Sequence, residues 1–220
     1  MFRRKPSLSQ DMADWIAACF DWFDARFLAP PRPILPTAEF FKAGPGRDHK
    51  TAVAVLADVK RLLRYDLPID LVPLARPPGE YRHSYQSMGE VGGTYQETDQ
   101  GRVISYDPEA LARPLGFINT MAHEVMHARL SGLQDQVPGG DDAHELATDL
   151  GCIIAGFGVF QLQAADDAGW SGYMTQDSRA FALAMFLDQR GLGAEAVAPH
   201  LSGRCKRYLK RARADLSHLT

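Results

Sequence analysis

The sequence predicts an α+β fold, mostly helical with a small antiparallel sheet, in a single domain that spans residues 1–220. Apolar residues recur every three to four positions in several segments, which is typical of amphipathic helices. Two short β-like runs are joined by turn residues, and this arrangement predicts a β-hairpin. The few strands are followed mostly by helices, an order typical of α+β proteins rather than of alternating α/β proteins.

The composition is that of an ordinary globular protein. Hydrophobic residues make up 45% of the chain and charged residues 23%, which excludes disordered, collagen-like and low-complexity classes. The longest apolar run, residues 151–160, is shorter than the ~20 residues that span a membrane. A formal net charge of −3 leaves no overall basic field, so no nucleic-acid partner is expected. Three scattered cysteines without a C-x-x-C pair indicate neither a cysteine zinc site nor disulfides, and we expect a cytoplasmic location.

The N-terminal part, residues 1–36, is predicted to contain one helix and a proline-rich linker. Apolar spacing predicts the helix over residues 9–28, and it ends before Pro30-Pro31-Arg32-Pro33 because proline lacks the amide donor that a helix needs. In the central part, residues 37–165, a second helix is predicted over residues 48–65. Residues 69–74 are predicted to form a short edge strand, since Pro73 cannot donate to the ladder of a central strand.

The central part, residues 37–165, continues with the hairpin. Its strands are predicted over residues 91–97 and 102–106, joined by Thr98-Asp99-Gln100-Gly101, whose Asp and Gly suit a turn. Asp107-Pro108-Glu109 then combines an N-cap acceptor with a proline at the first helical position, so a helix is predicted to run from there to about Leu130. Further helices are predicted over residues 142–165, 175–190 and 201–216, so that residues 166–220 form a set of C-terminal helices.

The helix predicted over residues 108–130 carries His123-Glu124-Val125-Met126-His127, an H-E-x-x-H motif. Residues four positions apart leave the same face of a helix, so His123 and His127 can both reach one zinc ion. Glu124 is displaced by about 100° around the helix, which makes it a poor third ligand but a suitable general base beside a water on the metal. The alternative is two ordinary helix histidines with a glutamate between them.

A catalytic zinc needs a third protein ligand. Eighteen residues after His127 comes Glu145, which is followed by Asp149 in an E-x-x-x-D pattern. Together with H-E-x-x-H, this pattern resembles the gluzincin metallopeptidases. The resemblance implies a zincin-like metal-site core in residues 37–165, with an active-site helix and a glutamate helix. It also implies that Glu145 is the third zinc ligand and that Asp149 accepts a hydrogen bond from the ring of His123, as carboxylates often do for metal-bound histidines.

Two alternatives stay open for the second motif. Asp142 and Glu145 also fit a capping box at a helix start, in which Glu145 would only close a helix end. His144 is a rival ligand, although it lies about 100° off the face that Glu145 shares with Asp149. Upstream, Pro36-Thr37-Ala38-Glu39-Phe40-Phe41 is similar to segments of uncharacterised bacterial zincin-like proteins. The resemblance therefore implies a minimal zincin core without the extra domains of larger gluzincins.

The same resemblance implies a substrate cleft. In zincins the strand before the metal helix forms the cleft edge, so Val103, Ile104 and Ser105 are expected to pair with an extended peptide. A plain hairpin strand is the alternative. Gluzincins also carry a downstream side chain that stabilises the tetrahedral oxyanion. Tyr173 is the first candidate for that role, followed by Arg179 and His200.

These expectations point to a zinc-dependent metallopeptidase that acts on a peptide or protein substrate, with Zn²⁺ as cofactor and Glu124 as general base. The alternative is a catalytically silent metal-binding module for peptide recognition or regulation, which would not need the intact Glu124. A deformylase-like hydrolase ranks last, because those enzymes use a cysteine ligand in a separate motif. The basic helix of residues 201–216 is interpreted as a solvated face. The sequence leaves substrate specificity and oligomeric state open.

Overall fold

The structure is a computed structural model that describes residues 6–74, 93–169 and 172–217. Its helices are, in chain order, α1 (Gln10–Asp24), α2 (His49–Leu63), α4 (Pro114–Leu130), α5 (His144–Cys152), α6 (Gly158–Asp167), α7 (Gln176–Asp188) and α8 (Gly203–Leu216). The strands are β1 (Asp70–Pro73), β2 (Gly93–Thr98) and β3 (Gly101–Tyr106). Short 3₁₀ segments are Pro108–Ala112, Gln134–Gln136, Asp141–Ala143, Ala194–Ala196 and Ala198–His200. The described chain is therefore mostly helical with one small sheet, as expected for an α+β protein.

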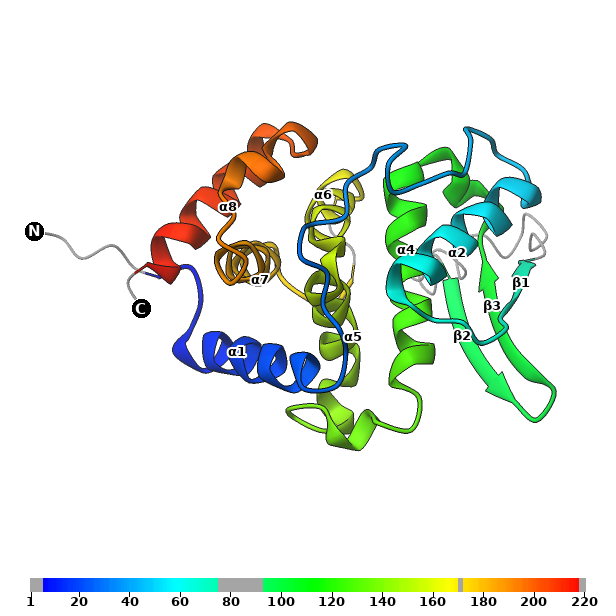
Figure 1. Cartoon of the computed structure of the whole chain (residues 1–220), viewed down its shortest axis with the longest axis horizontal. Helices are drawn as coiled ribbons and strands as arrows, with labels where there is room; N and C mark the ends of the chain where they lie inside the picture. The colour runs from blue at the N-terminus through cyan, green and yellow to red at the C-terminus, as the bar shows by residue number, and fades with distance from the viewer. Residues whose placement is uncertain (1–5, 75–92, 170–171, 218–220) are drawn as a thin grey trace, which may run out of the picture.

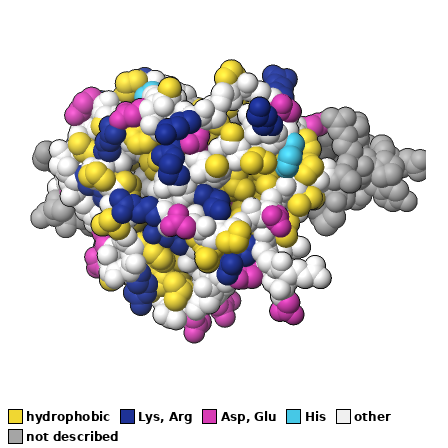
Figure 2. All heavy atoms as spheres, turned by 45° about the vertical axis from the view of Figure 1, so that its right-hand side comes forward, with side chains coloured by type: hydrophobic (Ala, Val, Ile, Leu, Met, Phe, Trp, Pro, Cys, Tyr) yellow, Lys and Arg dark blue, Asp and Glu magenta, His cyan; other side chains and the backbone are white. Residues whose placement is uncertain are grey.

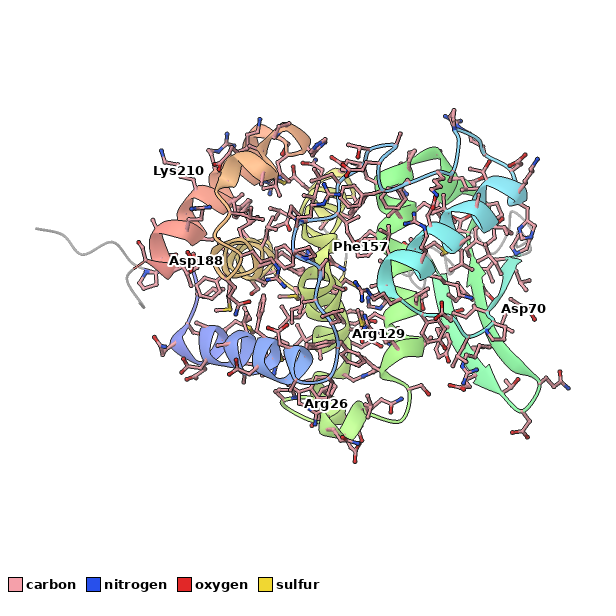
Figure 3. The ribbon with its side chains drawn as sticks, in the orientation of Figure 1. Arg26, Asp70, Arg129, Phe157, Asp188 and Lys210 are labelled. Atoms are coloured by element: carbon pink, nitrogen blue, oxygen red, sulfur yellow. The ribbon has the colours of Figure 1, made fainter. Side chains whose placement is uncertain are left out.

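Two helical columns, α4 and the α5–α6 stretch, run side by side through the middle of the molecule (Figure 1). The sheet and α2 pack on one side of α4, while α1, α7 and α8 pack on the far side of α5–α6 (Figure 1). Phe157, between α5 and α6, lies in the middle of the molecule (Figure 3) and is fully buried. The backbone amide of Ser7, before α1, donates to the carboxylate of Asp215 on α8, and this bond links the two ends of the described chain.

The first two helices lie where apolar spacing predicts them. The Ser9 hydroxyl caps α1 by accepting from the Met12 amide, and the Asp48 carboxylate caps α2 by accepting from the Thr51 amide. The α2 helix ends at Arg64, whose φ of 54° is left-handed. The predicted helices over residues 9–28 and 48–65 are confirmed, each longer than the observed helix by a few residues at its ends.

The sheet differs from the prediction in one respect. Its order is β1-β3-β2, with β2 antiparallel and β1 parallel to β3, so the sheet is mixed and the prediction of an antiparallel sheet was wrong. Turn residues specify the hairpin locally, whereas the direction of β1 depends on a longer connection without a local signal. The predicted hairpin is confirmed, with Thr98 paired to Gly101, although Val91 and Gly92 lie outside the described residues. The edge position of β1 is confirmed as well.

The helix predicted over residues 108–130 is divided in two. A 3₁₀ segment capped by Asp107 covers Pro108–Ala112, and α4 starts afresh at Pro114. Pro114 has no amide hydrogen and restricts the residue before it, and Arg113 accordingly adopts φ −123° and ψ 81°. The break leaves α4 as a separate helix that carries the whole H-E-x-x-H motif.

The helix predicted over residues 142–165 contains a kink. A π-helical turn, Ile153–Phe157, joins α5 to α6, and Gly156 within it has φ 97°. A Cβ at Gly156 would lie 2.8 Å from Pro30 Cγ, and the Gly156 carbonyl accepts from the Ile34 amide, so the linker packs directly on the kink. The stretch Asp141–Asp167 is long and apolar enough to cross a membrane, but 89% of its apolar window is buried, which is typical of a core helix in a soluble protein.

The C-terminal helices α7 and α8 pack against each other. Cys205, Leu209 and Ala212 face the core, while the cations of α8 lie on its solvent side, and Lys210 points outward (Figure 3). On the face drawn in Figure 2, Lys and Arg side chains are interspersed with Asp and Glu side chains. This exposure fits the interpretation of the basic helix as a solvated face.

Candidate metal centre

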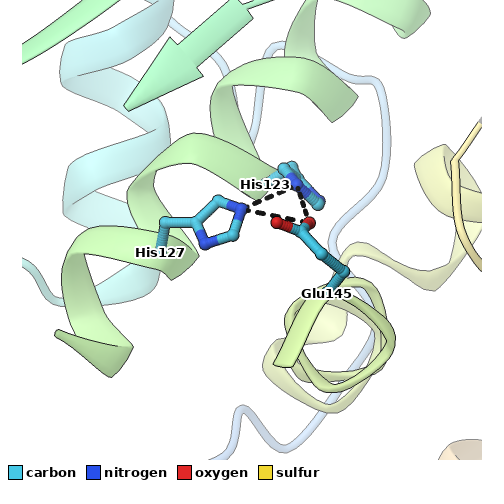
Figure 4. Close-up of side chains that lie close together, drawn as sticks. All are labelled: His123, His127 and Glu145. Atoms are coloured by element: carbon cyan, nitrogen blue, oxygen red, sulfur yellow. Dashed lines mark hydrogen bonds and ion pairs between the residues drawn. The ribbon is translucent and has the colours of Figure 1, made fainter. Parts of the chain in front are cut away.

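Three donor atoms from two helices converge on one point (Figure 4). His123 and His127 leave the same face of α4, and their Nε2 atoms lie 3.0 Å apart. Glu145, in the first turn of α5, places Oε2 3.4 Å from each of those nitrogens. The structure thus brings together all three residues that were expected to bind a metal, and we call them the donor triangle.

Two of the three edges of the donor triangle have the length expected for one face of a zinc coordination tetrahedron, and the third is shorter. Bonds of 2.0–2.2 Å at tetrahedral angles separate the ligand atoms by about 3.3–3.6 Å. The two 3.4 Å nitrogen–oxygen distances fit this range, while the 3.0 Å between the two Nε2 atoms is the length of a hydrogen bond. Oε2 of Glu145 is buried and lacks a well-aligned hydrogen-bond partner among the described residues. Two imidazole nitrogens and one carboxylate oxygen are also a donor set that suits zinc. The residues present therefore fit a bound divalent cation.

Electrostatics also favour a positive charge within the donor triangle. Burial lowers the pKa of His123, but hydrogen bonds to the Asp149 and Glu145 carboxylates outweigh it and raise that pKa to about 10. Hydrogen bonds to His123 and His127 in turn hold the pKa of Glu145 well below its usual range. Two carboxylates thus favour a cationic centre, a requirement that either a proton or a metal ion can meet.

Asp149 lies behind His123, one turn along α5 from Glu145. Its Oδ1 is 2.9 Å from His123 Nδ1, which leaves Nε2 of that ring facing the donor triangle. Although burial raises the pKa of Asp149, its hydrogen bond to His123 and the charges of His123 and Arg179 lower it to about 2. Asp149 is therefore a carboxylate in the position that orients the ring, where the resemblance to gluzincins places it.

His144 lies behind the other histidine. Its Nε2 is 3.0 Å from Nδ1 of His127, so it stands on the opposite side of that ring from the donor triangle. With Nε2 of His127 facing the triangle, Nδ1 carries the proton and donates it to His144. The structure therefore places His144 as a neighbour of a ligand rather than within the triangle. The capping-box alternative is not observed either, because α5 begins without a side-chain cap hydrogen bond.

Glu124 is buried between α4 and the sheet, with only 3% of its surface exposed. Burial raises its pKa, while the neighbouring His123 and His127 lower it. The backbone amide of Tyr95, on β2, donates to its carboxylate, and a Cβ on Gly93 would lie 3.3 Å from Glu124 Cγ. The carboxylate of Glu124 is thus held between the donor triangle and strand β2.

The expectation that Val103, Ile104 and Ser105 pair with a peptide was wrong. These residues belong to β3, which is the central strand, so β1 and β2 occupy both of its hydrogen-bonding edges. Ile104 is also fully buried. Strand β3, which precedes α4 in the sequence, is therefore not an edge strand of the sheet. Strand β2 lies against α4 and Glu124 instead.

Tyr173 is brought to the donor triangle. Its ring stacks on His123, with centroids 6.1 Å apart and planes 14° from parallel, and the nearby Glu145 carboxylate helps burial to raise the pKa of its phenol. About half of Tyr173 is exposed. Arg179 instead is buried behind Asp149, and His200 lies in the segment before α8, where the described residues give it no contact with the triangle. Only the first of the three oxyanion candidates therefore faces the site.

Sequence reasoning missed the residues that hold the site from outside the motifs. Gly93 and Tyr95 support Glu124, and Gly172 lies against Asp149. A weak signal existed for Gly93, because a glycine that opens a strand often marks a close approach of another chain segment. The roles of Tyr95 and Gly172 depend on backbone amides and on close packing, for which the sequence carries no signal.

No protein-family model, curated protein or solved structure matches the chain. The resemblance to gluzincins therefore depends on motifs of this sequence, chiefly residues 123–127 and 145–149. Function is inferred from these motifs and from the geometry of the donor triangle.

Proposed function

We propose that the protein is a zinc-dependent metallopeptidase of the gluzincin type. The observation that carries this proposal is the pairing of the donor triangle with a buried carboxylate, Glu124, on the adjacent flank of the same helix. A site that only stores a metal needs the triangle, whereas hydrolysis needs a base beside it.

His123, His127 and Glu145 would hold the ion through two Nε2 atoms and Oε2. When bound, zinc lowers the pKa of a water molecule and polarises a carbonyl group. Three protein ligands leave a fourth position open for that chemistry, as in other catalytic zinc sites. Asp149 and His144 keep the two rings oriented by accepting from their Nδ1 atoms.

Glu124 moves the proton. Its carboxylate takes a proton from the attacking water and delivers it to the nitrogen of the leaving amine. A pKa raised by burial suits this task, because a base that is too acidic holds the proton too weakly to pass it on. The Tyr95 amide fixes the carboxylate so that it need not reorganise during the reaction.

Tyr173 supplies a hydrogen bond to the carbonyl oxygen as negative charge develops on it. Burial and the nearby carboxylates raise the pKa of its phenol, so the hydroxyl stays protonated and able to donate. Its stacking on His123 places the side chain at the mouth of the donor triangle. An extended peptide would pair with the edge of β2, because this strand lies against Glu124.

A catalytically silent metal-binding module is the second candidate. The burial of Glu124 favours it, since a carboxylate that is 3% exposed and already accepts from Tyr95 also fits a purely structural role. The two candidates differ in one respect: only the peptidase requires Glu124 to exchange a proton.

Glu124→Gln separates them. Wild type, Glu124→Gln and the control Glu195→Gln are purified without chelators, analysed for metal content, and incubated with a peptide library that is read by mass spectrometry. Glu195 is exposed in the 3₁₀ segment Ala194–Ala196, outside the donor triangle and outside β2. The peptidase proposal expects one zinc per chain in all three, cleavage by wild type and the control, and at least about a hundredfold less cleavage by Glu124→Gln. Equal cleavage by Glu124→Gln would refute the proposal. Zinc without cleavage would favour the silent module, and cleavage restricted to N-formyl peptides would favour a deformylase.

A further inference from the structure

The carboxylate of Asp149 is the meeting point of three chain segments. Oδ1 lies 2.9 Å from His123 Nδ1 on α4 and 3.4 Å from Gln161 Nε2 on α6. Oδ2 accepts from the backbone amides of Tyr173 and Met174, at 2.9 and 3.3 Å. One oxygen thus contacts a candidate metal ligand, and the other holds the segment that carries the candidate oxyanion donor.

The segment 172–174 is closely fitted to this carboxylate. Gly172 has φ 84°, a conformation that side chains rarely adopt. A Cβ at this position would lie 2.9 Å from Asp149 Oδ2 and 2.4 Å from Arg179 Nη2. Only glycine therefore allows the chain to pass close enough for the next two amides to reach Asp149.

Arg179 approaches the same oxygen from α7. Its Nη2 lies 3.4 Å from Asp149 Oδ2, and only 1% of the side chain is exposed. Arg179 is the bulkiest of the fully buried side chains in the described residues. A guanidinium is rarely buried without a partner of opposite charge, and Asp149 is the carboxylate that the structure places against it.

We propose that Arg179 is a positioning residue that fixes the Asp149 carboxylate, and that Asp149 in turn holds both the His123 ring and the Tyr173 segment. The inference deepens the proposed peptidase function, because it links a metal ligand and the oxyanion donor to one anchor. Any rotation of the carboxylate moves Oδ1 and Oδ2 together. Loss of Arg179 therefore loosens the His123 ring and the Tyr173 segment at the same time.

The test uses two readouts that do not depend on catalysis. Zinc affinity is measured by competition with a chromophoric chelator, and hydrogen exchange of the Tyr173 and Met174 amides is measured by NMR on metal-free protein. The variants are Arg179→Met, which keeps the bulk but not the charge, and Arg179→Lys, which keeps the charge. Arg190→Met is the matched control, because Arg190 follows α7 and donates to the carbonyls of Pro30 and Phe186, away from Asp149.

Arg179→Met is expected to weaken zinc binding about 10- to 100-fold, the usual effect of losing a residue that orients a ligand. Exchange of the two amides should accelerate at least about tenfold relative to α4 amides. Arg179→Lys should restore part of both properties, and Arg190→Met should change neither. If Arg179→Met does not fold, Gly172→Ala disturbs the same contact from the other side and is expected to accelerate both amides.

Suppose that Arg179→Met has the circular dichroism spectrum of wild type. If its zinc affinity or its amide exchange is then unchanged, Arg179 does not hold the His123 ring and the Tyr173 segment through Asp149, and the proposal is wrong. For Gly172→Ala, slow exchange of both amides would have the same consequence. Failure of the wild-type chain to bind zinc would refute the proposed function instead, and the exchange rates of the two amides would then decide alone whether Arg179 holds the segment.

Discussion

Replacing Glu145 by alanine tests the donor triangle most directly, because the structure predicts opposite behaviour with and without metal. In the metal-free protein Glu145 is 41% exposed and lies 3.4 Å from two imidazole nitrogens. Such partly exposed pairs contribute at most about 1 kcal/mol to the free energy of unfolding. Glu145→Ala should therefore be only slightly less stable than wild type in a chelator.

The expected difference is larger when metal is bound. Free zinc at about 1,000 times the wild-type dissociation constant stabilises the folded state by about 4 kcal/mol. Residues that merely orient a ligand affect metal affinity about 10- to 100-fold, so loss of a ligand should cost at least about 100-fold. At the same free zinc the variant then gains only about 1.4 kcal/mol. The stability gap between the two proteins should widen by at least about 2.7 kcal/mol.

The assay is urea unfolding followed by far-UV circular dichroism, once with a chelator and once with free zinc held by a metal buffer. Glu97→Ala is the control. The carboxylate of Glu97 is 34% exposed and pairs with Arg102 at 2.6 Å, so it resembles Glu145 in exposure but lies outside the donor triangle. Its effect on stability should be the same in both conditions. If Glu145→Ala lowers the free energy of unfolding by the same amount with zinc and with chelator, Glu145 is not a ligand.

Three further outcomes follow from the structure. His144→Ala should weaken zinc binding about 10- to 100-fold, as measured by competition with a chelator. His144→Asn keeps an acceptor for His127 and should weaken zinc binding less. If His144→Ala binds zinc as tightly as wild type, His144 has no role in the site. Gly156→Ala should lower the free energy of unfolding in urea by about 2–5 kcal/mol, from left-handed strain and from the contact with Pro30, whereas Gly132→Ala, also left-handed but in open space, should cost only about 1–2 kcal/mol. Asp58 accepts from the amides of Lys42 and Ala43 and from Arg61, and these bonds hold its pKa below the usual value although burial opposes them. Because that pKa is lowered in the folded state, the stability advantage of wild type over Asp58→Asn should be fully present above about pH 4, the unfolded value, and be lost as the pH falls through the lowered folded-state pKa. A stability difference between the two proteins that does not depend on pH would contradict this assignment.

Local chemistry made most of the helices predictable. Ser9 and Asp48 cap α1 and α2 where the sequence places a helix start, and the apolar spacing behind them gives the buried face. The errors arise where a single residue outweighs the periodic pattern. Pro114 divides the helix predicted over residues 108–130, and Gly156 kinks the one predicted over residues 142–165. Neither break changes the apolar spacing, so periodicity alone does not show it.

The donor triangle was predictable for a geometric reason. Spacings of four residues place His123 with His127 on one helix face and Glu145 with Asp149 on another, so two helices need only meet face to face. The edge strand was not predictable in this way. The order of strands in a sheet depends on long connections, and the strand that precedes α4 in sequence lies in the centre of the sheet. Strand β2, which lies beside Glu124, is next to α4 only in three dimensions.

The arrangement of α4 and α5 suggests how the site is maintained. The three donor atoms already lie 3.0–3.4 Å apart, so a metal ion would find its ligands in place and little ordering would oppose its binding. Contacts within the triangle, where two imidazoles and a carboxylate meet, are only part of what holds this arrangement. Contacts outside the triangle support it too: Asp149 and His144 contact the two rings, and the apolar flanks of both helices are buried. Substitutions at these supporting positions should therefore alter metal affinity while leaving all three ligands unchanged, which is the behaviour expected of a preorganised site.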